Sequence, residues 1–282
     1  MIRLPIGRFF ENFLDWTVAH CAEFTRLCSR CIDSGVDALK NVFCAPPELV
    51  MLLIFCAIIF VVGNRRKQLV FGAAAGMLLI IMLGLWEAAM ETIALMIICT
   101  IATVAIGIPL AILMTFCSWL KKILLPLLDI MQTMPAYVYL VPAIAFFSIS
   151  NTSGVFATVV FALPPIVRMT VLGIENTPSD LLECSEAFGA TPFQRLFDLE
   201  LPTALSSIRA GLNQTVMLAL SMVVIASLVG AQGVGSVVWG AICNGEKGVA
   251  FEGGIVIVII AIILDRTLQA TGGITPMRGE EK

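Results

Sequence analysis

The sequence predicts an all-α integral membrane protein with about seven transmembrane helices. Only 13% of its 282 residues are charged, whereas 59% are hydrophobic and the mean hydropathy is +0.98. A soluble domain of ordinary composition has about a quarter of its residues charged. The apolar residues also gather into runs close to the roughly 17 to 25 residues that cross a bilayer as a helix. Little of the chain is therefore left for a globular domain.

Residues 1–46 form a predicted amino-terminal segment that differs from the apolar runs. Between Pro5 and His20, apolar residues such as Phe9 and Trp16 lie on one helical face, and charged residues such as Arg8 lie opposite. This pattern indicates an amphipathic helix in the membrane interface, with a partner-binding helix as the alternative. No short apolar core precedes a small-residue cleavage site, so membrane insertion is expected to depend on the spans themselves.

Seven apolar runs follow within a predicted transmembrane domain of residues 47–270. They are residues 47–62, 69–86, 92–116, 135–149, 154–171, 212–229 and 249–264. Prolines inside the third, fourth and fifth runs predict kinks or breaks, which membranes tolerate where neighbouring groups satisfy the freed carbonyls. The remaining residues, 271–282, are a short polar tail that is expected to fray.

Basic residues fall in alternate loops between the predicted spans. They are Arg65, Arg66, Lys67, Lys121, Lys122, Arg168, Arg195, Arg209 and Arg266. The other loops carry mainly acidic or neutral residues, among them Glu87, Glu91 and Asn151. Because basic loops stay in the cytoplasm, we expect the amino terminus outside and the carboxyl terminus inside. The same rule places residues 174–210 in the cytoplasm.

Residues 174–210 are the longest polar interruption between two apolar runs. Pro178, followed by serine and aspartate, predicts a helix start, and Gly189 predicts its end at a positive φ. A second start at Thr191 and Pro192 leads into a helix that Pro202 is expected to end. The segment is thus predicted to be two short amphipathic helices joined at a glycine turn. Such a rigid protrusion suits docking on a soluble partner.

The spacing within this segment resembles the EAA loop, E-A-A-x3-G-x9-I-x-L-P, of permease subunits of bacterial ABC importers. The matching residues are Glu183, Gly189, Leu199, Leu201 and Pro202. Cys184 and Ser185 replace the two alanines, and a leucine replaces the isoleucine. The resemblance implies that this loop, including Ala187, is a coupling helix that contacts an ATPase subunit. It further implies that the glutamate positions the helix, the glycine forms the elbow and the two leucines seat the second helix.

Three other stretches are similar to the glycine betaine/proline permease branch of this family. They are residues 131–140, 161–170 and 217–226, and the similarity covers about residues 85–269. The resemblance implies a type I importer permease in the bacterial inner membrane, paired with a second copy as a homodimer. Two ATPase subunits inside, which hold ATP and Mg²⁺, and a solute-binding protein outside complete the expected complex. Uptake of glycine betaine, proline betaine or a related quaternary ammonium compound would serve osmoprotection, and this chain itself would bind no cofactor.

A few polar and aromatic residues are candidates for a translocation pathway. Asn213, Gln214 and Ser221 are the polar residues of the sixth run, although hydrogen bonding between helices would also explain them. Tyr137 and Tyr139 offer aromatic faces that attract a quaternary ammonium. Aromatic residues near span ends also serve as interfacial anchors.

Several other function classes lack their required residues. The sequence contains no G-x4-G-K-[ST] string, so ATP hydrolysis must come from another chain. One histidine and nine scattered cysteines give no metal-ligand spacing, and no basic tract indicates nucleic acid. Ionisable residues fall at span ends rather than near the midplane, which disfavours a self-sufficient ion-coupled carrier. That carrier and an importer permease for another small solute, such as an amino acid, stay as alternatives.

Overall fold

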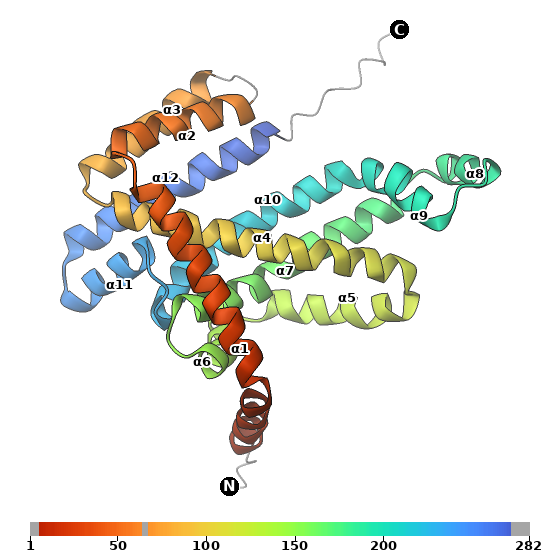
Figure 1. Cartoon of the computed structure of the whole chain (residues 1–282), viewed down its shortest axis with the longest axis horizontal. Helices are drawn as coiled ribbons and strands as arrows, with labels where there is room; N and C mark the ends of the chain where they lie inside the picture. Colours follow the sequence, from red (N-terminus) through yellow and green to blue (C-terminus); the bar gives the residue numbers. More distant parts are fainter. Residues whose placement is uncertain (1–5, 64–66, 272–282) are drawn as a thin grey trace.

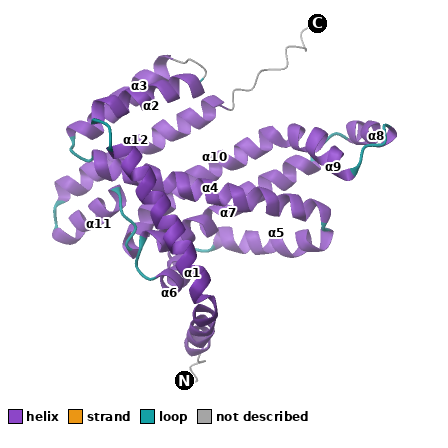
Figure 2. Cartoon of the chain, viewed as in Figure 1, coloured by secondary structure: helices purple, strands orange, loops and turns teal. Residues whose placement is uncertain are grey.

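The computed structural model describes residues 6–63 and 67–271, and every regular element in these ranges is helical (Figure 1; Figure 2). The predicted all-α class is therefore confirmed. In chain order, the elements are α1 (Ile6–Cys44), α2 (Glu48–Val62), α3 (Lys67–Met82), α4 (Trp86–Phe116), α5 (Ser118–Thr133), η1 (Ala136–Tyr139), α6 (Leu140–Phe147), α7 (Asn151–Glu175), α8 (Ser179–Ala187), α9 (Pro192–Gln194), η2 (Arg195–Glu200), α10 (Leu201–Ala226), η3 (Ser227–Val229), α11 (Val234–Asn244) and α12 (Lys247–Thr271).

The long helices α4, α7 and α10 form the centre of the molecule (Figure 1). Small residues lie where these helices meet. A Cβ atom added at Gly173 on α7 would lie 2.8 Å from Ser207 Cβ on α10, and one at Gly107 on α4 would lie 2.5 Å from Ile166 Cγ2 on α7. Because larger side chains would clash there, glycine sets the close approach that stabilises helix pairs inside membranes.

A second group of helices comprises α2, α3 and α12 (Figure 1). Its inner faces join the largest apolar cluster, in which Met77 of α3 and Ile260 of α12 are buried. Its outward faces remain apolar, since Phe71 is 77% exposed and Val258 56% exposed. Large apolar side chains turned outward indicate contact with the acyl chains of a bilayer.

The helix α1 is much longer than the predicted segment between Pro5 and His20. Its part Thr25–Cys44 meets α2 at 104°, so it lies across the direction of the spans. Lys40 on α1 forms ion pairs of 3.1 and 3.2 Å with Glu87 and Glu91 on α4. The side chains of residues 6–13 lie outside the described part, and the interfacial role of the first turns stays a prediction. The domain boundary at residue 46 falls at the break between α1 and α2 and is also a prediction.

Four helices are long and apolar enough to cross a membrane: Trp86–Phe116, Asn151–Glu175, Pro192–Val229 and Lys247–Ala270. Two bent pairs, α1 with α2 and α5 with α6, raise this number to as many as six among the described residues. The predicted count of seven therefore stays a prediction. The helices α4 and α7 continue through Pro109 and through Pro164 and Pro165, so these prolines do not break them.

The predicted span at residues 135–149 is not a single helix but part of a bent pair with α5. These residues form the short elements η1 and α6, which meet α5 at 113°. Met134 has the extended ψ of 137° that a residue before proline prefers, and this conformation ends α5 before Pro135. The helices α5 and α11 occupy segments in which no span was predicted.

Candidate functional site

The helix α8 lies at the protruding end of the central helices (Figure 1). It begins after Pro178 and ends at the predicted glycine turn, where Gly189 has a φ of +75°. The amide of Ala190 donates to the carbonyl of Ser185 over 3.0 Å and closes the helix end. A Cβ at Gly189 would meet nothing within 4 Å, so backbone conformation rather than space requires glycine here. Both predicted boundaries are confirmed.

The second predicted helix also starts where expected but does not stop at Pro202. Thr191 caps it through a capping box with Gln194, whose backbone amide donates to Thr191 Oγ1. From there Pro192–Val229 forms one continuous helical run of 38 residues. The π-helical turn η2 precedes the proline, and the amide of Leu201 donates to the carbonyl of Leu196 in its wider hydrogen-bonding pattern.

The π-helical turn explains the wrong prediction at Pro202. In a regular α-helix, a proline lacks the amide hydrogen and its ring clashes with the carbonyl four residues earlier. A π-turn changes the hydrogen-bonding register just before the proline, and such bulges commonly absorb this conflict. Pro202 thus lies in the first turn of α10, joining the loop directly to a long central helix.

An ion-pair network fixes α8 against the helix that follows. Arg195 Nη1 lies 2.8 Å from Glu186 Oε1 on α8 and donates a hydrogen bond to it. Arg195 Nε lies 2.9 Å from Glu200 Oε1, an ion pair without a well-aligned hydrogen bond. The side chain of Glu200 is only 12% exposed. Glu186 and Glu200 were not among the predicted site residues, and Arg195 was considered only as a basic residue that indicates topology.

A small apolar cluster anchors the base of this loop. Leu196 is 1% exposed and packs with Ile174 at the end of α7 and Ala204 on α10. Leu201 packs against the same cluster, whereas Leu199 is half-buried, and the seating role of both leucines stays a prediction. Leu196, the buried leucine of this cluster, is therefore not one of the residues of the EAA-loop motif.

The outer surface of the loop combines the predicted contact residues with exposed phenylalanines. Glu183, Cys184, Ala187 and Gly189 are exposed on or beside α8, whereas Ser185 is half-buried and donates to the carbonyl of Leu182. The exposed aromatic residues are Phe188, Phe193 and Phe197, at 87%, 68% and 57%. Exposed apolar side chains at a protruding tip are typical of a protein-binding surface.

The candidate pathway residues separate into two groups. On α10, Asn213 is half-buried, while Gln214 and Ser221 are exposed. The hydroxyl of Ser221 donates to the carbonyl of Met217 within the same helix, over 3.0 Å. Within the described part of the chain, the hydroxyl of Ser221 makes no hydrogen bond to another helix, and its side chain lies on the exposed face of α10.

The two tyrosines also have different environments. Tyr137 is 60% exposed, whereas Tyr139 is 7% exposed. The hydroxyl of Tyr139 donates to the carbonyl of Met131, and its ring packs edge-on against Phe161 at 5.7 Å. Only Tyr137 thus offers a free aromatic face. Among residues 6–63 and 67–271, no three His, Cys, Asp or Glu side chains are arranged to hold a metal ion.

Residues 104–269 match the family model described as the binding-protein-dependent transport system inner membrane component. The chain is 43% identical to the glycine betaine transport system permease protein OpuAB of Bacillus subtilis (strain 168), over 95% of this chain and 94% of that one. It is 41% identical to the glycine betaine/proline betaine transport system permease protein ProW of Escherichia coli (strain K12), over 99% of this chain and 78% of that one.

A solved structure of the MetNI methionine ABC transporter in an inward-facing conformation is also similar. It superimposes with a TM-score of 0.59 at 24% sequence identity, over 66% of this chain and 95% of that one. This similarity concerns the fold. It agrees with the helical arrangement described above.

Proposed function

The chain belongs to the family of binding-protein-dependent inner-membrane transport components, and on that premise we propose that it carries a betaine-class compatible solute into the cell. It is a multi-pass permease subunit of an ABC importer rather than an enzyme, and a separate subunit hydrolyses ATP. Family membership implies an ATPase and a solute-binding protein as partners. ATP and Mg²⁺ are expected on the ATPase, with no cofactor on this chain.

The exposed tip formed by α8 and Phe188 is the observation that supports this function best. We propose that this tip docks on the ATPase, with Glu183, Cys184 and Ala187 at the contact. The ion pair between Arg195 and Glu186 holds α8 against the helical run Pro192–Val229. A movement of the ATPase would therefore reach α10 through continuous helix rather than through a flexible loop.

The free polar face of α10 supports pairing with a second copy of the chain. The exposed polar residues Ser206, Gln214 and Ser221, with the small Ala210 between them, recur at helical spacing along this helix. Polar side chains inside a membrane are stabilised when they line a water-filled path or contact another helix. We propose that two copies face each other here and enclose the solute path. Tyr137 would contribute a cation–π contact worth about 0.5–2 kcal/mol.

The proposed topology has the amino terminus outside and the loop of α8 in the cytoplasm. An ion pair between Lys121 and Glu175 joins the start of α5 to the end of α7, close to the loop that follows α7. The basic residues near this end agree with a cytoplasmic location. The angle of 104° between α1 and α2 agrees with a helix that lies along the outer membrane surface.

The substrate proposal is tested by solute competition in proteoliposomes that contain the permease, its ATPase and its binding protein. Radiolabelled glycine betaine should accumulate with ATP, and excess proline betaine or another quaternary ammonium solute should reduce the uptake. Uptake of an amino acid without any competition by betaines would assign a different solute to the same transport machinery.

A further inference from the structure

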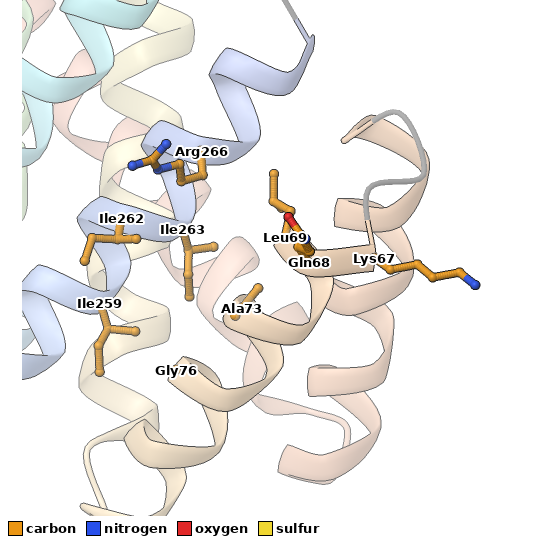
Figure 3. Close-up of a pocket in the computed structure, with 10 residues that line it drawn as sticks. Lys67, Gln68, Leu69, Ala73, Gly76, Ile259, Ile262, Ile263 and Arg266 are labelled. Carbon is orange, nitrogen blue, oxygen red and sulfur yellow. The ribbon is translucent and has the colours of Figure 1, made fainter.

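A cavity of about 620 Å³ lies between α3 and α12, and none of its lining residues belongs to α8 or α10 (Figure 3). Figure 3 shows Ile259 and Ile263 on α12 facing Ala73 and Gly76 on α3. The size lies in the range of roughly 300–1,000 Å³ that is usual for small-ligand sites. The two helices therefore border a half-open apolar space that their own side chains do not fill.

Glycine residues on α3 give this cavity the shape of a wedge. A Cβ at Gly76 would lie 2.7 Å from Ile259 Cγ2, so the two helices touch at that level. One turn earlier, a Cβ at Gly72 would meet nothing within 4 Å. The helices thus diverge toward the start of α3, and the open end of the wedge lies there.

The open end of the cavity carries two cations. Lys67 in the first turn of α3 and Arg266 near the end of α12 both line it, together with the amide side chain of Gln68. Both cationic residues are exposed, and in Figure 3 the Lys67 side chain extends away from α12, so a change of its rotamer brings the ammonium toward the groove. Long cationic side chains reach from the apolar region to the phosphate level of a bilayer. The cavity thus joins an apolar groove to a positively charged end.

The surroundings of the cavity indicate which ligand reaches it. Ile262 at its edge is 55% exposed, and Phe71 on the neighbouring face is 77% exposed, so the flanking surface is suited to acyl chains. In a bilayer, the molecules that combine an apolar chain with a phosphate at its end are the phospholipids themselves. Anionic headgroups are attracted by about 1 kcal/mol, or a factor of about five, for each nearby lysine or arginine.

We propose that this cavity binds one anionic phospholipid. An acyl chain lies along Gly72 toward Gly76, and the headgroup phosphate lies between Lys67 and Arg266. The lipid fills the space between α12 and α3 and thereby stabilises the packing of the α2–α3 hairpin against the other helices. This proposal depends on the cavity and its two cations and not on the identity of the transported solute.

Lipid retention by the purified transporter tests this proposal. Phosphatidylglycerol and phosphatidylethanolamine that remain after detergent washing are quantified by mass spectrometry for the wild type and for the double variant Lys67→Gln/Arg266→Gln. Retained phosphatidylglycerol should fall by about fivefold for each cation removed, while phosphatidylethanolamine changes little. The matched control Lys122→Gln/Arg209→Gln removes two exposed cations outside the cavity and should retain wild-type amounts.

A second variant tests the apolar part of the site. Gly72→Leu places a side chain in the open part of the wedge and should abolish the retention of phosphatidylglycerol. If that variant does not fold, Ile263→Phe narrows the same space from α12 and should have the same effect. Unchanged retention in the double variant, or in either cavity-filling variant once folded, overturns the proposal. Disulfide cross-linking of two Gly72→Cys chains also overturns it, because the occupant would then be a second copy.

Discussion

Arg195 Nη1 lies 2.8 Å from Glu186 Oε1 and joins α8 to the helix that leads into the centre of the protein. Glu186 is 64% exposed and Arg195 is 34% exposed, so solvent screens this pair. Exposed pairs of this kind typically contribute less than about 1 kcal/mol to stability. The value of this contact therefore lies in the orientation of α8 rather than in the stability of the fold.

Glu186→Gln should reduce solute uptake per ATP hydrolysed by several fold while leaving the melting temperature nearly unchanged. The amide keeps the shape of the side chain but loses the charge that holds Arg195. Uptake and phosphate release are measured together in proteoliposomes. Glu246→Gln, an exposed change in the loop before α12, serves as the control. A normal ratio in the Glu186 variant would show that α8 does not need this pair.

Gly189→Asp should leave the protein inserted in the membrane but uncouple ATP hydrolysis from uptake. The new carboxylate would stand beside Glu186 on the proposed ATPase contact surface, and an L-residue in the left-handed region costs about 1–2 kcal/mol. Asparagine adopts a positive φ about as readily as aspartate but carries no charge. Gly189→Asn should therefore retain more coupling between ATP hydrolysis and uptake than Gly189→Asp. Uptake in membrane vesicles is the measurement, and normal uptake by the aspartate variant would contradict the lever interpretation.

Leu196→Ala should lower the free energy of unfolding by about 2–5 kcal/mol, because Leu196 is buried at the base of the loop. Leu199→Ala, at a half-buried position in the same helix, should cost about 1 kcal/mol. Thermal unfolding of the two purified variants checks this order. If Leu199→Ala lowered the free energy of unfolding more than Leu196→Ala, the residue that anchors the base of the loop would be Leu199 of the motif instead.

Labelling of two native cysteines tests the proposed topology. Cys184 on α8 and Cys243 on α11 are both exposed in the structure. A membrane-impermeant maleimide should label Cys184 only in inside-out vesicles and Cys243 only in right-side-out vesicles, as read by peptide mass spectrometry. Variants Cys184→Ala and Cys243→Ala confirm the assignment of each label. Labelling of Cys184 from the outer side would show that the orientation is opposite to the proposed one.

Local chemistry made part of the candidate site predictable from the sequence. The start of α8 at Pro178 and its end at Gly189 depend on backbone preferences of the residues themselves. The continuation of the next helix through Pro202 was not predictable in this way, because it depends on the π-turn η2. The motif also gave no signal for Leu196, whose burial depends on Ile174 and Ala204 from two other helices.

The membrane spans were likewise predictable from the sequence only in part. The long helices α4, α7 and α10 were expected because their apolar runs are nearly unbroken. The helix α5 was missed because Lys121, Lys122 and Pro126 interrupt its apolar pattern, although it packs against α4 and α7. The position of α1 across α4 and α7 depends on polar contacts far apart in sequence, such as Asp33 with Thr152 at 2.9 Å.

The most direct test of the central claim is uptake of radiolabelled glycine betaine by proteoliposomes made with and without the ATPase subunit. With the ATPase, the binding protein and ATP, the solute should accumulate against its gradient. With this chain alone, it should not accumulate under a proton or sodium gradient. Accumulation driven by an ion gradient without the ATPase would contradict the assignment of this chain as the permease subunit of an ABC importer.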